Sequence, residues 1–133
     1  MVKIYADGGC LRQGTPDAEG YGSIRTIGKS DTTIRYQFPD ARTNNAAEYE
    51  ALLRALSVID LATRNTAWQG EITIYMDSDL VINQVLGLWK CKASHLVPYR
   101  DNARALLAQL ISSGIEIKLQ WVGNELIKQM LGH

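Results

Sequence analysis

The chain has 133 residues, the size of one domain with a buried core, and its hydrophobic content of 46% excludes intrinsic disorder. Its longest apolar stretches are far too short to span a bilayer. The formal net charge is zero, so any basic face for a nucleic acid must be local.

The two cysteines, Cys10 and Cys91, have neither the spacing of a metal site nor that of a disulfide framework, so we expect reduced thiols. The first residues have the pattern of a strand rather than of a signal peptide. We therefore expect a cytoplasmic location.

The first third of the chain has the pattern of a β-meander. Strands are expected at residues 2–10, 20–29 and 32–38, with a loop at residues 14–17 and a hairpin turn at residues 28–31.

A long helix is expected next, over residues 44–64, because apolar residues recur there at helical spacing. Either Thr43 or Asn44 can cap its N-terminus. Residues 71–76 are almost continuously apolar, which is typical of a strand in the middle of a sheet.

Helices and a strand alternate in the last third. Helices are expected at residues 78–86, 98–113 and 124–131, and a strand at residues 115–122. Residues 88–96 are irregular and mildly basic. The order β-β-β-α-β-α-α-β-α predicts an α/β (mixed α+β) fold, with a five-stranded mixed sheet flanked by helices. Without a repeat or linker, we expect residues 1–133 to form one domain.

Three acidic residues lie where they can converge. Asp7 and Asp77 each end a predicted strand, and Glu48 lies in the first turns of the long helix. Carboxylates packed together repel one another and need a cation. Clustered oxygen ligands suit a hard ion such as Mg²⁺ or Mn²⁺.

Four stretches together resemble ribonuclease H, type 1, over essentially the whole chain. They are Tyr5-Ala6-Asp7-Gly8-Gly9, the helix start from Thr43 to Ala51 with its pattern Thr-Asn-Asn-x-x-Glu, the Asp77-Ser78 helix start, and Gln120-Trp121-Val122. Each is weak alone, but all four occur in order and in the expected secondary structure.

The resemblance implies a ribonuclease H-like fold and hydrolysis of the RNA strand of RNA–DNA hybrids, leaving 5′-phosphate and 3′-hydroxyl ends. It implies two Mg²⁺ or Mn²⁺ ions, one activating water and one stabilising the leaving 3′ oxygen. Asp7 would hold both ions, and Glu48 and Asp77 the ion at the leaving group. A monomer without an obligate protein partner is the family's default.

The resemblance also assigns contacts with the hybrid to a set of residues near Asp7 and Glu48. Glycines lack a Cβ, so their backbone can lie close to a ribose, whose 2′-hydroxyl separates RNA from DNA. The set is Gly8, Gly9, Cys10, Thr43, Asn44 and Asn45.

The family's fourth acid, early in the last helix, has no Asp counterpart here. Asn124 is the first choice for its place, as a catalytic and metal-binding residue, because helix starts favour Asn. Glu125 is the alternative, since it keeps the charge. With Asn124 in that place, we expect weaker metal affinity and a preference for Mn²⁺.

Other residues depart from the family or have two interpretations. Asp79 replaces a usual Gln and is interpreted as a solvated acid in a helix's first turn. A basic protrusion is absent, with Lys90, Lys92 and His95 as its reduced substitute, and a shallow salt dependence is expected. Arg12 and Gln13 can reach a phosphate of the substrate, or can be ordinary loop residues. The tryptophans, Trp68, Trp89 and Trp121, are interpreted as packing residues rather than as stacking platforms.

Two other functions are considered. A non-catalytic nucleic-acid-binding module is suggested by the missing fourth acid, although three acids remain. A DNA exonuclease or integrase-like enzyme would share the fold. The Thr43-Asn44-Asn45 pattern and the glycine pair after Asp7 favour ribonuclease H over both.

Overall fold

The protein is described by a computed structural model over residues 1–64 and 70–132. Its elements follow the expected order, with one short 3-10 turn, η1, added before α3. They are β1 (Val2–Leu11), β2 (Glu19–Ile27), β3 (Asp31–Phe38), α1 (Asn44–Thr63), β4 (Glu71–Met76), α2 (Asp79–Val85), η1 (Ser94–Leu96), α3 (Val97–Ser112), β5 (Glu116–Trp121) and α4 (Asn124–Leu131).

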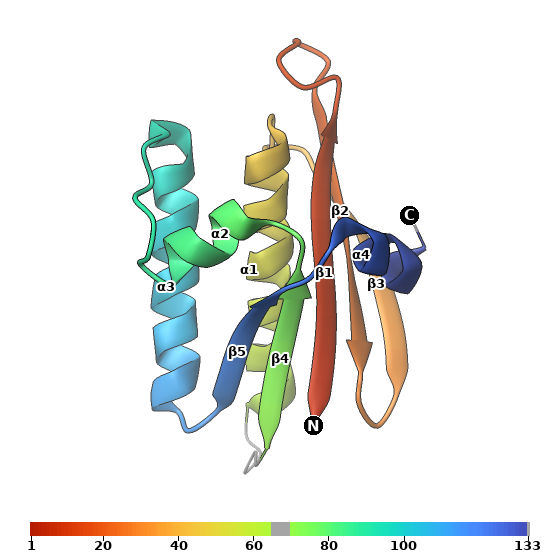
Figure 1. The fold of residues 1–133 in the computed structure, drawn as a ribbon, viewed down its shortest axis with the longest axis vertical. Coiled ribbons are helices and arrows are strands. Elements are labelled where there is room, and N and C mark those ends of the chain that lie inside the picture. The colour runs from red at the N-terminus through yellow and green to blue at the C-terminus, as the bar shows by residue number, and fades with distance from the viewer. Residues whose placement is uncertain (65–69, 133) are drawn as a thin grey trace.

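Among the described residues, the strands form one five-stranded sheet in the order β3-β2-β1-β4-β5 (Figure 1). β2 pairs antiparallel with β1 and β3, whereas β4 pairs parallel with β1 and β5. This confirms the mixed sheet and the predicted fold class. β4 lies inside the sheet, between β1 and β5, and this interior position explains its nearly continuous apolar run.

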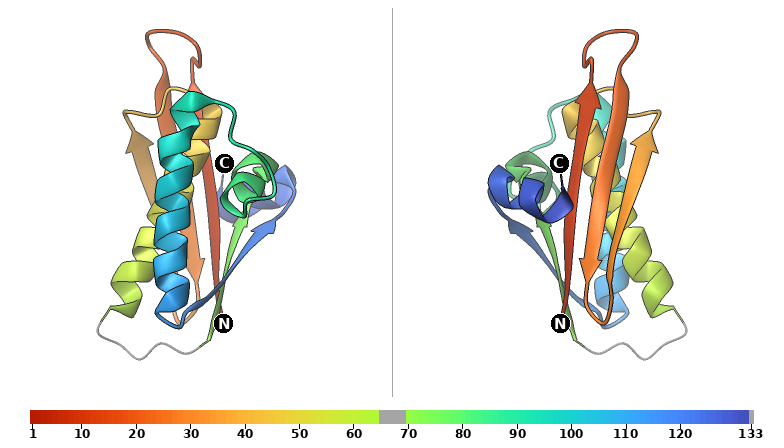
Figure 2. Two further views of the ribbon diagram at one scale, coloured as in Figure 1. Left: turned by 90° about the vertical axis from the view of Figure 1, so that its left-hand side faces the viewer. Right: turned by 90° about the vertical axis from the view of Figure 1, so that its right-hand side faces the viewer.

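Helices cover both faces of the sheet (Figure 2). α1 and α3 lie on one face, where Ile4 and Ala6 of β1 belong to the larger core. α4 lies on the other, where Tyr5 packs with Ile127 and Leu131. The alternation of side chains along β1 therefore serves two cores.

α1 begins where its sequence allows a cap. Thr43 is the N-cap, and its hydroxyl accepts a hydrogen bond from the Ala46 amide at 3.1 Å. That bond satisfies one of the free N–H groups of the first turn. The helix ends at Thr63, one residue before the predicted limit.

The packing interpretation of the tryptophans is wrong for two of them. The side chains of Trp89 and Trp121 are 50% and 47% exposed. Trp121 ends β5, which is an edge strand, and Trp89 lies in the surface connection after α2. Trp68 lies outside the described residues. No helix in the described part of the chain is long and apolar enough to cross a membrane.

Candidate active site

Asp7 and Asp77 lie where two parallel strands separate. The pairing of β1 with β4 ends at Tyr5 opposite Tyr75, and each acid follows two residues later. Parallel strands bring their carboxyl ends to one edge of a sheet, where ligands of such folds bind. The alternation of the strand then sends both side chains to the same side of this edge.

Glu48 reaches the same place from α1 because Gly8 lets the helix come close to β1. A Cβ on Gly8 would overlap the carbonyl group of Ala47, and it would lie 2.7 Å from the Glu48 nitrogen. No real Cβ is found so close to backbone atoms. Gly8 therefore acts first as the contact point between strand and helix.

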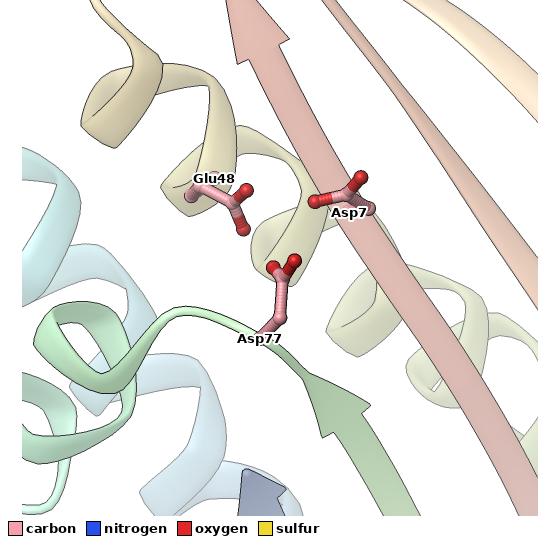
Figure 3. A group of neighbouring side chains, drawn as sticks. All are labelled: Asp7, Glu48 and Asp77. Carbon is pink, nitrogen blue, oxygen red and sulfur yellow. The ribbon is translucent and has the colours of Figure 1, made fainter. Parts of the chain in front are cut away.

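Each of the three carboxylates offers an oxygen atom, and these atoms lie within 4.8 Å of one another (Figure 3). Asp7 and Asp77 are half-buried, whereas Glu48 is only 9% exposed. The Glu48 Oε2 atom is buried and has no hydrogen-bond partner among the described residues.

The pKa of Glu48 is raised to about 10 in the metal-free protein, and burial is the largest cause. The hydrogen bond with Asp7 and the charges of Asp7 and Asp77 contribute to this rise, whereas the Gly8 backbone N–H acts against it. No positively charged side chain is among these causes. A partnerless buried oxygen among clustered carboxylates fits a hard divalent cation, so these residues could hold a metal ion.

Asn124 joins this cluster from the first turn of α4. Its Nδ2 atom donates a hydrogen bond to Asp77 Oδ2 at 2.6 Å. Glu125, the alternative, is an exposed residue of the same turn. The structure thus brings Asn124 beside the three acids, with its NH₂ group facing a carboxylate.

Trp121 also touches the site, which the sequence did not suggest. Its Nε1 atom donates to the backbone carbonyl of Asp77 at 3.2 Å. The pairing of Met76 with Trp121 at the end of β4 and β5 brings the indole there. The signal in the sequence was the place of Trp121 in the Gln120-Trp121-Val122 stretch, which comes directly before Gly123.

Three of the predicted substrate residues form hydrogen bonds at the start of α1. The Cys10 amide donates to Asn44 Oδ1 at 2.8 Å, and the Asn44 amide donates to Gln13 Oε1 at 2.5 Å. Thr43 Oγ1 lies 3.3 Å from His95 Nε2. These bonds place residues from β1, its following loop, α1 and η1 on one surface.

The remaining predicted residues lie around this surface. Gly8 and Gly9 are buried, and Asn45 is exposed. Asp79 lies in the first turn of α2 and is exposed, as expected for a solvated acid at a helix start. Arg12 forms an ion pair with Glu19 at 3.0 Å, and this pair partly neutralises the positive charge of Arg12.

The comparisons with known proteins agree with this geometry. A family model described as RNase H matches residues 1–124. The bifunctional protein Rv2228c of Mycobacterium tuberculosis (strain ATCC 25618 / H37Rv) is 35% identical over 123 residues, which are 91% of this chain and 31% of the relative. The chain thus spans about a third of that relative's length.

Three solved structures resemble the fold. LC11-RNase H1 in complex with an RNA/DNA hybrid, isolated from compost by a metagenomic approach, has a TM-score of 0.81 and 20% identity, covering 97% of this chain and 90% of that one. The N-terminal RNase H domain of Rv2228c from Mycobacterium tuberculosis has a TM-score of 0.74 and 26% identity, covering 96% and 90%.

RNase H1 from the halophilic archaeon Halobacterium salinarum NRC-1 has a TM-score of 0.72 and 25% identity, covering 96% of this chain and 89% of that one. These likenesses agree with the strand order and with the helices on both faces. The family match over residues 1–124 shows that this chain belongs to the RNase H family.

Proposed function

We propose that the chain is a metal-dependent endoribonuclease that hydrolyses the RNA strand of RNA–DNA hybrids and leaves 5′-phosphate and 3′-hydroxyl ends. The observation that carries this proposal is the convergence of Asp7, Glu48 and Asp77, in which the buried Glu48 Oε2 atom has no hydrogen-bond partner among the described residues. Family membership and the hybrid bound by LC11-RNase H1 support this choice of substrate.

Two Mg²⁺ or Mn²⁺ ions, when bound, would activate the attacking water and stabilise the leaving 3′ oxygen. Asp7 would contribute to both positions. Glu48 and Asp77 would hold the position near the leaving group, and Asn124 the position near the water. Asn124 would offer its carbonyl oxygen, which requires its amide to turn from the orientation it has beside Asp77.

The chain's own residues would orient the hybrid. Cys10, Thr43 and Asn44 lie near the carboxylates in the chain and offer amide groups and a hydroxyl, which suit phosphates and riboses. Gly8 and Gly9 add backbone that a ribose can approach, and a 2′-hydroxyl is what separates the RNA strand from DNA. We further propose a cytoplasmic monomer without an obligate protein partner.

The proposal is tested by cleavage of an end-labelled RNA–DNA hybrid with Mg²⁺ or Mn²⁺. The wild-type protein is compared with the Asp7→Asn variant on the same hybrid. Asp101→Asn is the matched control, because Asp101 is an exposed acid of α3 paired with Arg100. We expect metal-dependent cuts in the RNA strand, lost in Asp7→Asn and kept in Asp101→Asn.

The same assay separates the other functions. Binding of hybrid without any cleavage would refute the enzyme and favour a binding module. Cleavage of a DNA–DNA duplex at a comparable rate would favour an exonuclease or integrase-like enzyme. Of these, the module has one observation in its favour, which is the neutral Asn124 beside Asp77.

A further inference from the structure

α4 is a short helix that reaches across the sheet from the candidate active site. Its apolar side, with Ile127 fully buried and Leu131 at 2% exposure, packs on Tyr5 of β1 and on Tyr75 of β4. Eight helical residues span about 12 Å. One end of α4 therefore lies at Asp77, and the other lies over the outer strands β2 and β3 (Figure 1).

Two arginines hold the C-terminal end of α4. Arg25 Nη1 donates to the carbonyl of Met130 at 2.8 Å, and Arg35 Nη2 donates to the carbonyl of Leu131 at 2.9 Å. The last carbonyls of a helix have no partner within the helix, and cations are favoured there. Gly132 ends the helix in the left-handed conformation, so these carbonyls are free to accept from outside.

The two guanidinium groups are themselves fixed by the sheet. Arg25 forms a two-pronged ion pair with Asp31, through Nε at 2.8 Å and Nη2 at 2.7 Å. Arg35 Nη1 donates to the buried hydroxyl of Ser23 at 3.1 Å. Ser23 lies opposite both Arg35 and Asp7 in the sheet register, so one row of residues joins the helix end to the catalytic strand.

The N-terminal end of α4 is held through Asp77 and the end of β4. Its N-cap, Gly123, has no side chain to bond the first turn. The backbone bond from Val122 to Met76 at 2.9 Å fixes the preceding strand, and the Asn124 amide reaches Asp77. The backbone hydrogen bonds of a helix keep its two ends in a fixed relation. The contacts at the C-terminal end of α4 therefore help to set where Asn124 lies at its N-terminal end.

We propose that Arg25 and Arg35 are positioning residues, which hold the Asn124 backbone beside Asp77 through α4. From this place the Asn124 side chain bonds Asp77 in the metal-free protein and can turn to offer its carbonyl oxygen when a metal is bound, so the arginines raise the metal affinity of the site. This positioning role rests on one part of the proposed function, which is metal binding at the carboxylate cluster. It does not require that the protein cleaves a hybrid. The bonds of the two arginines run to the end of α4, to Asp31 and to Ser23. The double-mutant cycle below therefore tests whether their effect passes through Asn124 rather than through the sheet.

The first experiment measures the position of Asn124 without metal. In the metal-free protein, the side-chain NH₂ signals of Asn124 in an ¹⁵N-correlated NMR spectrum report its bond to Asp77. We expect the Arg25→Met/Arg35→Met variant to move these signals toward those of a solvent-exposed asparagine. The backbone amide signal of Ile127 should stay helical, which shows that α4 has not detached.

Arg54→Met is the matched control, because Arg54 is an exposed arginine of α1 whose guanidinium lies 5.3 Å from the Tyr36 ring centroid. It should leave the Asn124 signals unchanged. If the double variant detaches α4, the Arg25→Lys/Arg35→Lys variant is measured in its place. Lysine keeps the charge but loses the fork that bonds two acceptors at once, so a smaller shift of the same signals is expected.

The second experiment measures Mn²⁺ binding by calorimetry in a double-mutant cycle. The arginine substitutions should weaken Mn²⁺ binding about tenfold, the low end for residues that orient metal ligands. In the Asn124→Ala background the same substitutions should have no further effect. An equal loss in both backgrounds would mean that the arginines act on the fold, and would overturn the proposal.

Unchanged Asn124 signals in every arginine variant that keeps α4 in place would also overturn it. A protein that fails to cut hybrid, yet shows the expected signals and cycle, would refute the proposed function and leave the positioning role intact. Cleavage of hybrid by the wild-type protein, together with equal effects of the arginine substitutions in both backgrounds of the cycle, would support the proposed function and refute the positioning role.

Discussion

Glu48→Gln should stabilise the metal-free protein at neutral pH, although it removes a residue of the candidate active site. The folded protein holds the pKa of Glu48 at about 10, whereas the ordinary value in an unfolded chain is 4.5. Between these values the folded state keeps a proton that the unfolded chain has lost. Stability from this group is thus full below pH 4.5 and is lost as pH rises toward 10.

The size of the effect follows from the pKa difference. At pH 7 the unfolded carboxyl is roughly 2.5 pH units above its pKa, and each unit corresponds to about 1.36 kcal/mol, so the cost is about 3 kcal/mol. A glutamine carries no such cost, and its NH₂ group can donate to Asp7 as the protonated acid does. For a domain of this size, the midpoint of thermal unfolding should rise by about 10 °C.

The assay is urea unfolding of both proteins in EDTA, at several pH values from 4.5 to 9. The difference in unfolding free energy should grow with pH, from near zero at pH 4.5. Glu116→Gln, at an exposed position of β5, is the control and should follow the wild type. If the unfolding free energies of the wild type and Glu48→Gln changed in parallel with pH, the reasoning would be refuted, because the pKa of Glu48 would then not be raised by folding.

Three further substitutions test the site and its supports. Asn124→Asp should lower the Mg²⁺ concentration needed for half-maximal cleavage, because a fourth carboxylate adds charge to the cluster; an unchanged requirement would place Asn124 outside the metal shell. Gly8→Ala should lower the free energy of unfolding by about 1–3 kcal/mol, since the added carbon must push α1 away at Ala47; an unchanged urea midpoint would contradict the close contact. Thr43→Ala should cost about 1 kcal/mol by the same measurement, through the lost helix cap, and Thr43→Ser should restore most of it.

Local patterns in the sequence were sufficient for the elements of the fold. The alternation of apolar residues, the glycine and proline breaks and the cap at Thr43 each depend on neighbouring residues alone, so element order and approximate limits could be predicted. The motif around Asp7, Glu48 and Asp77 predicted their convergence, because strand ends and helix starts gather at one edge of such a sheet.

Local patterns were not sufficient for exposures and contacts that depend on segments far apart in the sequence. Trp89 and Trp121 are apolar in character, yet their exposure depends on which strand lies at the edge of the sheet and where a connection runs. Likewise, the bond between Thr43 and His95 joins residues 52 positions apart.

The sequence by itself determined the periodicities and the acids, because these are properties of neighbouring residues and of side-chain chemistry. The tertiary structure alone decided that the Glu48 Oε2 atom is buried without a hydrogen-bond partner among the described residues. It also decided that Asn124 faces Asp77, and that Arg25 and Arg35 hold the end of α4. Such contacts depend on how helices pack on a sheet, and packing is fixed by all the buried side chains together rather than by any local pattern.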